Sequence, residues 1–364
     1  LIFKPNLTIM QKNQSFFVVG VMSGTSLDGI DLSLVEFKFK DNEWRYNFIS
    51  SNTEDYSTDW RARLAQARYK SKIELETLDS EYTSFLGDKI REFIESNSKY
   101  PIDLVCSHGH TVFHEPDKGI TYQMGNKKEL SDIVNHTVVC DFRVQDVSLG
   151  GQGAPLVPGG EFYLFKEYVA CVNLGGFANI SLLDGETPIA YDIAAANLVL
   201  NRFSVALNLP YDSGGKIASE GFVIPEFLLK LNELSYYDLK PPKSLGVEWI
   251  TDNLESVFEE FKDEYLPDLM HTYCVHLADQ ISRVLPKQGK VLFSGGGTHN
   301  TFLIELIDEK SSAEIVIPSI DLIDFKEALI FGFLGLLKYL NQDNCFASVT
   351  GSKHNHSTGV ILKK

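Results

Sequence analysis

The sequence predicts an α/β protein of two domains, each with a mixed β-sheet flanked by helices. Its 364 residues exceed the usual size of one hydrophobic core, and 44% of them are hydrophobic, which is enough for two cores. Each half of the chain also contains a glycine turn between two strand-like runs, which indicates an internal duplication. After the first turn, apolar residues at three- and four-residue intervals predict two helices within residues 59–97.

The first glycine turn lies in residues 16–37, which read FFVVGVMSGTSLDGIDLSLVEF. Runs rich in β-branched and aromatic residues flank the turn-forming segment MSGTSLDG and predict a β-hairpin. The backbone N–H groups of its tip, with the hydroxyls of Ser23, Thr25 and Ser26, could line a site for phosphate oxygens. The tip lacks the GxxxxGK[ST] pattern and leads into a strand, so it is neither a P-loop nor a dinucleotide fingerprint. Taken alone, the segment favours a plain turn without a ligand.

Two further glycine clusters strengthen the phosphate interpretation. Residues 169–184, VACVNLGGFANISLLD, repeat the hairpin pattern around Gly175 and Gly176. Residues 290–307, KVLFSGGGTHNTFLIELI, place three glycines after a strand and before a helix, with Asn300 as the expected N-cap. A helix N-terminus beside a flat triglycine is a surface that the base and ribose of a nucleotide can approach closely.

Six motifs taken together resemble the anhydro-N-acetylmuramic acid kinase family, within the superfamily of sugar kinases, Hsp70 and actin. They are GVMSGTSLDGID at 20–31, SHGHTVFHEP at 107–116, DFRVQDVSLGGQGAPLVP at 141–158, NLGGFANIS at 173–181, PPKSLG at 241–246 and GGGTHN at 295–300. The resemblance implies a two-domain, actin-like ATPase fold with nucleotide between the domains. Domain I, residues 16–140 and 326–364, would carry the first phosphate loop and part of the sugar site. Domain II, residues 141–325, would carry the second phosphate loop and the adenosine loop.

The resemblance also implies which residues form an ATP site and a sugar site. ATP would contact Gly24, Thr25, Ser26, Leu27, Asp28, Gly29, Ile30, Asp31, Gly175, Gly176, Gly295, Gly296, Gly297 and Asn300. The sugar would contact His108, His110, Thr111, Arg143, Gln152, Gly153 and Asp192. Mg²⁺ would accompany ATP and balance the charge of its phosphates.

Asp141 is the residue that we expect to perform the chemistry. It closes the apolar strand predicted for residues 137–140, so its carboxylate should lie at the carboxyl end of that strand, where open α/β sheets place ligands. There it can accept a proton from an attacking hydroxyl or water. A cap on a turn or helix is the alternative role. Arg143 could neutralise substrate or phosphate charge, and an ion pair with Asp146 is an equally good interpretation.

Three histidines could bind either a metal ion or a sugar. His108, His110 and His114 have the spacing HGHTVFH, which fits no standard zinc pattern. The resemblance implies hydrogen bonds from these side chains to a sugar, and a purely structural histidine is the alternative for each. We assign no residue as a metal ligand. Asp192 is expected at the junction between a short strand and a helix.

The resemblance implies an ATP-dependent kinase of a cell-wall sugar. It would open 1,6-anhydro-N-acetylmuramic acid with water and phosphorylate O6, giving N-acetylmuramic acid 6-phosphate in peptidoglycan recycling. Three departures from the family pattern leave other functions open. An alanine run occupies residues 194–196 where Gly-Pro-Gly-Asn is common, His110 replaces a usual Gln, and Val247 replaces a usual Arg. The alternatives are a kinase of another anhydro sugar, such as levoglucosan, and a non-catalytic protein that binds ATP.

Charge and composition exclude several kinds of partner. A net charge of -16 argues against a nucleic-acid surface, because such surfaces are rich in Lys and Arg. Neither a membrane-spanning apolar run nor a signal-peptide pattern is present, so we expect no membrane partner. The five cysteines lack metal-like spacing, which fits the reducing cytoplasm. We also expect a homodimer.

Overall fold

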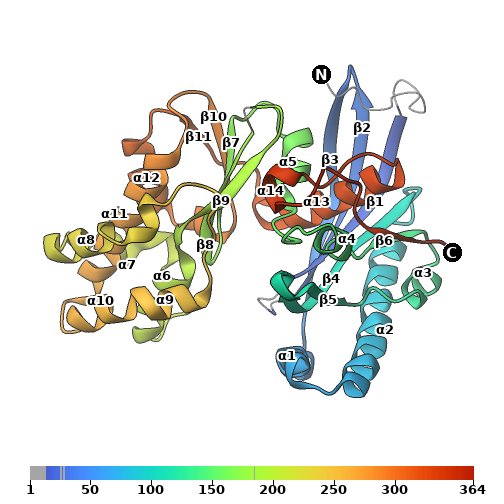
Figure 1. The fold of residues 1–364 in the computed structure, drawn as a ribbon, viewed down its shortest axis with the longest axis horizontal. Coiled ribbons are helices and arrows are strands. Elements are labelled where there is room, and N and C mark those ends of the chain that lie inside the picture. The colour runs from blue at the N-terminus through green and yellow to red at the C-terminus, as the bar shows by residue number, and fades with distance from the viewer. Residues whose placement is uncertain (1–13, 25–26, 28, 184) are drawn as a thin grey trace. The chain divides into compact units, whose positions relative to one another are not determined.

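The computed structural model of the chain describes residues 14–24, 27, 29–183 and 185–364 (Figure 1). These residues form two units. Unit 1 takes its residues from Leu1–Phe165 and Phe325–Lys364, and unit 2 comprises Lys166–Asp324. Each unit contains a mixed β-sheet with helices packed around it, so the expected α/β class is confirmed.

The sheet of unit 1 is built around the first glycine hairpin. Its strands are β1 (Gln14–Ser23), β2 (Gly29–Lys40), β3 (Glu43–Asp55), β4 (Leu104–Glu115), β5 (Ile120–Met124), β6 (Val138–Cys140) and β12 (Val360–Leu362). The strand order is β12-β6-β4-β1-β2-β3, and β5 pairs with β4. Strands β1, β2 and β3 are antiparallel, whereas β4 runs parallel to β1 and β6 runs parallel to β4. The predicted hairpin is therefore confirmed, and the chain's last apolar run forms the edge strand β12.

The sheet of unit 2 repeats this topology. Its strands are β7 (Ala170–Leu174), β8 (Phe177–Leu182), β9 (Ile189–Ala195), β10 (Lys290–Ser294) and β11 (Glu314–Val316), in the order β11-β10-β7-β8-β9. Strands β7, β8 and β9 are antiparallel, like the first three strands of unit 1. On the other side of β7, β10 runs parallel to β7 and β11 runs parallel to β10. Because a hairpin with a third strand and two crossovers occurs in both units, the structure supports the internal duplication.

Helices cover both faces of the unit 1 sheet, which explains why its central strands are apolar almost throughout. The helices of this unit are α1 (Thr58–Ala65), α2 (Lys72–Ser96), α3 (Glu129–Val134), α4 (Val144–Ser148), α5 (Val157–Leu164), the greater part of α13 (Ile320–Tyr339) and α14 (Ala347–Thr350). One face packs on α2, whose buried side chains include Tyr82 and Leu86. The other packs on α13, which approaches so closely that a Cβ on Gly20 would lie 2.0 Å from Ala328 O.

A buried ion pair joins α5 to α13. Lys326 Nζ lies 2.8 Å from Glu161 Oε1, and the two side chains are 4% and 2% exposed. Glu161 Oε2 makes no hydrogen bond with any residue that the structure describes. The Glu161 carboxylate therefore depends on Lys326 for compensation of its charge.

Unit 2 has one continuous apolar cluster between its sheet and its helices. The helices are α6 (Asn197–Ala206), α7 (Lys216–Ser219), α8 (Pro225–Asn232), α9 (Val247–Asn253), α10 (Glu255–Glu260), α11 (Leu266–Val284) and α12 (Thr301–Lys310). The alanine run at residues 194–196 lies inside this cluster and is almost completely buried.

Short 3₁₀ segments occur in both units, at Ala67–Tyr69, Pro116–Lys118, Ser213–Gly215, Ser235–Asp238 and Gly296–His299. None of the helices in the described ranges is long and apolar enough to cross a membrane.

The division between the units falls after Phe165, whereas we expected it between residues 140 and 141. The segment between these two points bonds to the C-terminal part of the chain. Gln152 N donates to Thr350 O at 2.8 Å, and Tyr163 Oη donates to Asp343 O at 3.1 Å. These contacts explain why the segment that carries Asp141 lies in unit 1.

Candidate active site

Asp141 directly follows strand β6, and its backbone adopts the left-handed conformation with φ of 55°. Asp and Asn are among the few non-glycine residues that enter this region readily, and here the turn leads from the buried strand into α4. Burial raises the pKa of the Asp141 carboxyl above its usual range, and a hydrogen bond from the Val144 backbone N–H opposes this shift. A carboxylate offers about four lone pairs, so it can hold this amide and still accept a proton. The catalytic and capping roles of Asp141 are therefore compatible.

Hydrogen bonds join three of the expected sugar residues. Arg143 Nε donates to His108 Nε2 at 2.9 Å, and Arg143 Nη1 donates to Gly153 O at 2.7 Å. Because Nε2 accepts, the proton of the neutral His108 ring lies on Nδ1, which donates to Gly109 O at 2.8 Å. Burial and the Arg143 charge hold the pKa of His108 well below its usual value, so the ring is neutral.

Arg143 does not form the ion pair with Asp146 that we considered, so that alternative is wrong. The Asp146 carboxylate instead accepts the Gly153 N–H at 2.7 Å and the Thr350 hydroxyl at 2.7 Å. Burial lowers the pKa of the Arg143 guanidinium to about 10, and the nearby Glu327 carboxylate opposes this shift. Arg143 therefore remains a cation at neutral pH.

His110 and Thr111 line a cavity of about 350 Å³ within unit 1. Leu27 from the hairpin tip and Arg68 also line it, so the cavity adjoins both the first phosphate turn and the sugar segment. Its volume lies in the range of pockets that hold small molecules. Burial lowers the pKa of His110 to about 4, although a backbone hydrogen bond with Gly24 opposes the shift. His110 is therefore neutral above about pH 5 and can donate or accept a hydrogen bond.

The low pKa of His110 makes a testable prediction about stability. The folded value is about 4 and the usual unfolded value is about 6.5, so protons favour the unfolded chain between these limits. The contribution of His110 to stability is complete above about pH 6.5, decreases as the pH falls, and is lost by about pH 4. At pH 5 this loss should be about 2 kcal/mol.

Urea unfolding of the wild type and of His110→Gln at pH 7 and pH 5 measures this effect. The glutamine of the variant cannot titrate in this range. We expect its urea midpoint to fall less than that of the wild type between the two pH values. Equal falls would show that His110 takes up no proton on unfolding.

The first phosphate turn is described only in part. Gly24 and Leu27 lie in the tip, while Gly29, Ile30 and Asp31 begin β2. Asp31 Oδ1 accepts a hydrogen bond from Thr53 Oγ1 at 2.6 Å. Three expected ATP residues lie outside the described residues: Thr25, Ser26 and Asp28.

The structure brings together the two glycine clusters of unit 2. Strand β10 runs parallel to β7, with Ser294 paired to Asn173, so the clusters leave the sheet at the same edge. A Cβ on Gly297 would lie 2.7 Å from Leu174 Cβ, and one on Gly295 would lie 2.6 Å from Asn173 Oδ1. Only glycine allows this close approach of the triglycine to the turn of Gly175 and Gly176.

Hydrogen bonds fix both glycine clusters. The N–H groups of Ala196 and Asn197 donate to the carbonyls of Gly176 and Gly175, at 2.8 and 3.2 Å. Asn300 Oδ1 accepts the Leu303 N–H at 3.0 Å, which confirms Asn300 as the N-cap of α12. Gly296 is exposed, and nothing lies within 4 Å of the position that its Cβ would take.

Two other expected sugar residues, Asp192 and Gln152, make hydrogen bonds to partners other than Arg143. Asp192 lies within β9 and not at the junction of strand and helix, so that expectation is wrong. Its Oδ2 accepts the Leu245 N–H at 2.8 Å, and burial raises the pKa of its carboxyl. Gln152 is exposed and uses its backbone N–H to bond Thr350 O. Asp192 thus holds the PPKSLG loop, and the Gln152 backbone holds the C-terminal segment.

Sequence reasoning missed the roles of Asp146 and Glu327. Asp146 is completely buried and fixes the Gly153 turn through its carboxylate. Glu327 is exposed on α13, close enough to Arg143 and Asp31 for their charges to affect it. The sequence feature that could have identified Glu327 as a candidate site residue is its position as an acidic residue directly before the apolar run ALIFGFLGLL.

Comparisons with known proteins show the family to which the chain belongs. The sequence profile of the family described as "Anhydro-N-acetylmuramic acid kinase" matches residues 16–364. The anhydro-N-acetylmuramic acid kinase of Francisella tularensis subsp. novicida is 30% identical over 378 residues, covering 95% of this chain and 98% of that protein. The protein of the same name from Pseudomonas syringae pv. syringae is 30% identical over 369 residues, covering 95% and 99%.

Among solved structures, the activator of the 2-hydroxyisocaproyl-CoA dehydratase from Clostridium difficile with bound ADPNP is a distant neighbour. Its TM-score is 0.40 at 13% identity, covering 86% of this chain and 92% of that one. With its relatives named as kinases over nearly their whole length, the chain is a phosphotransferase of the α/β class. It belongs to the anhydro-N-acetylmuramic acid kinase family.

Proposed function

We propose that this chain opens 1,6-anhydro-N-acetylmuramic acid with water and transfers the γ-phosphoryl group of ATP to O6. Water adds to the anomeric carbon as the bond from that carbon to the bridging oxygen breaks, and the freed O6 attacks the γ-phosphorus. The products are N-acetylmuramic acid 6-phosphate and ADP, in the recycling of peptidoglycan. Family membership over residues 16–364 supports the substrate, and the site of Asp141 supports the chemistry.

The observation that carries the proposal is Asp141 in its turn at the carboxyl end of β6. We assign Asp141 as the base that takes the proton from the attacking water. Its raised pKa brings the carboxyl nearer to the working pH, which improves a general base as long as it stays ionised. Arg143, fixed by His108 and Gly153, would stabilise the negative charge that develops on the substrate or phosphate.

The remaining sugar contacts come from both units in this proposal. In unit 1, His110 and Thr111 would bind hydroxyl groups from the cavity wall, and Gly153 and Gln152 would bind through the loop that Asp146 holds. In unit 2, Asp192 would act mainly through the loop that it fixes at Leu245.

ATP would be held by the glycine turns of each unit. We assign its phosphates to Gly24 to Asp31 of the first hairpin and to Gly175 and Gly176 of the second. Its adenosine would lie on Gly295 to Gly297, beside the helix that Asn300 caps. The backbone comes within reach of a ligand at these positions because glycine has no side chain.

Mg²⁺ fits the residues present in unit 1. Asp31 and Glu327 influence each other electrostatically, and carboxylate oxygens are the ligands that Mg²⁺ prefers. We propose these two carboxylates as its protein contacts. When bound, the ion would neutralise charge on the transferring phosphate.

The test is a reaction with ATP and 1,6-anhydro-N-acetylmuramic acid in ¹⁸O-labelled water. Mass spectrometry should find sugar 6-phosphate with one label on the anomeric oxygen and none in the phosphate. Preformed product kept in the same water controls for exchange at the anomeric carbon. If the chain phosphorylated only levoglucosan, the substrate assignment would change to that sugar. If it bound ATP but formed no product from either sugar, the chain would be a non-catalytic protein that binds ATP.

Gly296 offers a clean test of the adenosine assignment. Replacing Gly296 by Leu should weaken ATP binding at least about tenfold, because the new side chain fills space that the nucleotide needs. The fold should be unaffected, since no described atom lies near the new Cβ. Calorimetric titration with ATP measures the effect, and the melting temperature without ATP is the control. Unchanged affinity would remove Gly296 from the adenosine site.

We also propose that the chain works in the cytoplasm as a homodimer. All five cysteines are free and buried, as is usual where thiols stay reduced. Light scattering on the purified protein tests the dimer, and a monomeric mass at working concentration would exclude it.

A further inference from the structure

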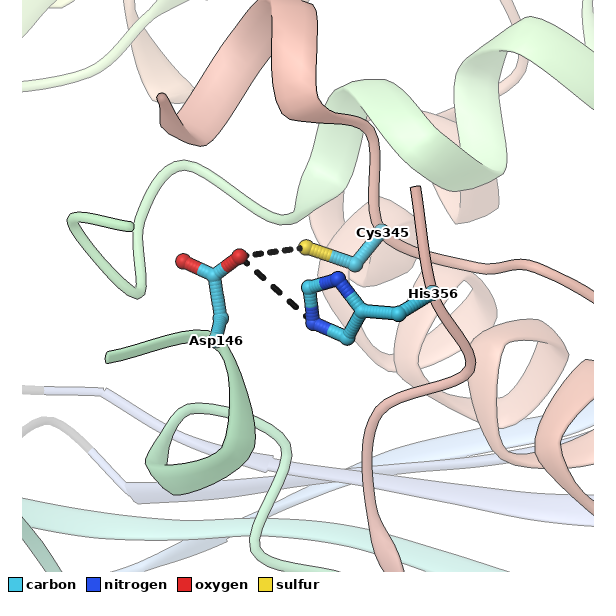
Figure 2. A group of neighbouring side chains, drawn as sticks. All are labelled: Asp146, Cys345 and His356. Carbon is cyan, nitrogen blue, oxygen red and sulfur yellow. Dashed lines mark hydrogen bonds and ion pairs between the residues drawn. The ribbon is translucent and has the colours of Figure 1, made fainter. Parts of the chain in front are cut away.

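Three side chains that could ligate a metal converge in unit 1, next to the loop of Gln152 and Gly153. Figure 2 shows Asp146 of α4 facing Cys345 and His356 of the C-terminal segment. Cys345 Sγ lies 3.2 Å from Asp146 Oδ1, and His356 Nε2 lies 3.5 Å from the same oxygen. One ligand atom from each of the three side chains lies within 4.8 Å of the others, and all three residues are buried.

The protonation of His356 is the decisive feature of this cluster. Its Nδ1 lies 3.1 Å from the carbonyl oxygen of His354, which can only accept, so Nδ1 carries a proton. In the neutral ring Nε2 then has a lone pair, and this atom makes no hydrogen bond with any described residue. A buried lone pair that faces a carboxylate oxygen is repelled unless a proton or a metal ion lies between the two atoms.

We propose that Asp146, Cys345 and His356 bind a zinc ion through Oδ1, Sγ and Nε2. Zinc lies about 2.0 to 2.3 Å from such ligands, so two ligands of a tetrahedral site are about 3.3 to 3.6 Å apart. The two distances from Asp146 Oδ1 are close to these values. Mixed sulfur, nitrogen and oxygen ligands are typical of zinc and unsuited to Mg²⁺ or Ca²⁺.

Charge balance also favours zinc at this place. Binding replaces the thiol proton of Cys345, which leaves to solvent, so a thiolate, a carboxylate and a neutral imidazole surround a divalent cation. The site then has no net charge, as a buried position requires. Burial raises the pKa of the Cys345 thiol, and the charge of the metal reverses this effect.

Neighbouring groups complete the site. The Thr350 hydroxyl lies 2.7 Å from Asp146 Oδ1 and 3.9 Å from Cys345 Sγ, where it can orient the carboxylate or become the fourth ligand. Asp146 Oδ2 accepts the Gly153 N–H, which fixes the direction of Oδ1. The ion would thus fasten the C-terminal segment to the loop that holds Arg143.

Metal analysis of the full chain tests the proposal. Protein from zinc-supplemented culture, dialysed against a weak chelator, should contain one zinc per chain. Cys345→Ser and His356→Gln should weaken zinc binding by more than about 100-fold. Losing a residue that only hydrogen-bonds to a metal ligand already weakens binding by up to about 100-fold, and losing a ligand itself should cost more. The matched controls are His354→Gln, an exposed histidine two residues away, and Cys274→Ser, a buried cysteine of unit 2. Both controls should keep the metal.

A second measurement uses the wild type alone, in case the variants do not fold. Refolding in Co²⁺ should produce a thiolate-to-metal charge-transfer band, and X-ray absorption of the zinc form should show one sulfur at about 2.3 Å. Wild-type protein without stoichiometric zinc after refolding in zinc would overturn the proposal and leave a hydrogen-bonded cluster. Zinc without a sulfur ligand, or zinc retained by both ligand variants, would overturn the assignment equally.

Discussion

Asp141→Asn should lower the turnover number by about 10² to 10⁴-fold, the usual contribution of a general base. The amide keeps the shape of the side chain, and its oxygen can still accept the Val144 N–H, but it cannot take a proton from water. Proton transfer becomes necessary only as water bonds to the anomeric carbon, so the ground-state complex needs the carboxylate much less. Dissociation constants for ATP and sugar should therefore change little. Steady-state kinetics and calorimetry of the same preparation measure both quantities.

The pH profile of the reaction provides a second readout for Asp141. Its raised pKa places the acid limb above the usual aspartate value of about 3.9, and activity falls with decreasing pH because the base becomes protonated. This limb should disappear from the residual activity of Asp141→Asn. The matched control is Asp103→Asn: Asp103 precedes β4, at the opposite end of the sheet, and binds Phe17 N. Near-normal turnover of Asp141→Asn would move the search for the base to Asp192 and to Glu248, an acidic residue in the first turn of α9.

Lys326→Met should destabilise unit 1 by about 3 to 5 kcal/mol, the usual effect of removing one partner of a buried ion pair. The methionine fills much of the space but leaves Glu161 as a buried charge whose Oε2 already lacks a hydrogen bond among the described residues. Chemical unfolding, with the tryptophans of unit 1 as the signal, measures the change.

The double variant Lys326→Met with Glu161→Leu separates charge from packing. Replacing both partners of a buried ion pair with apolar groups is often neutral or stabilising. The double variant should therefore be more stable than Lys326→Met alone. If the two were equally unstable, the loss would lie in the packing between α5 and α13, and the ion pair would contribute little.

The hairpins and their turns could be predicted because their information is local. Alternation of apolar residues identifies β1, β2, β7 and β8, and glycine pairs identify the turns between them. Asn300 was recognised as an N-cap from its position just before an apolar stripe. The α/β class followed from these elements together with the helical periodicity of residues 59–97.

The interactions that sequence reasoning missed join residues far apart in the chain. Asp146 is 199 residues from Cys345, and no periodic pattern connects a short helix after the first sheet to a polar C-terminal segment. The sequence suggests Asp146, three residues away, as an ion-pair partner of Arg143, whereas in the fold Arg143 bonds to His108 on β4. Only tertiary packing decides between such partners, and this also explains the placement of the segment after Asp141 in unit 1.

The position of α13 in the chain has a consequence for synthesis on the ribosome. Strands β1 to β6 are complete by Cys140, yet the helix that covers the Gly20 face of their sheet follows the whole of unit 2. At about 5 to 20 residues per second, translation from β6 to the end of α13 takes on the order of 10 to 40 seconds. During this interval Val18 and Phe37, which later pack on α13, have no partner helix. The nascent chain thus presents an apolar sheet surface that chaperones can bind until α13 leaves the ribosome.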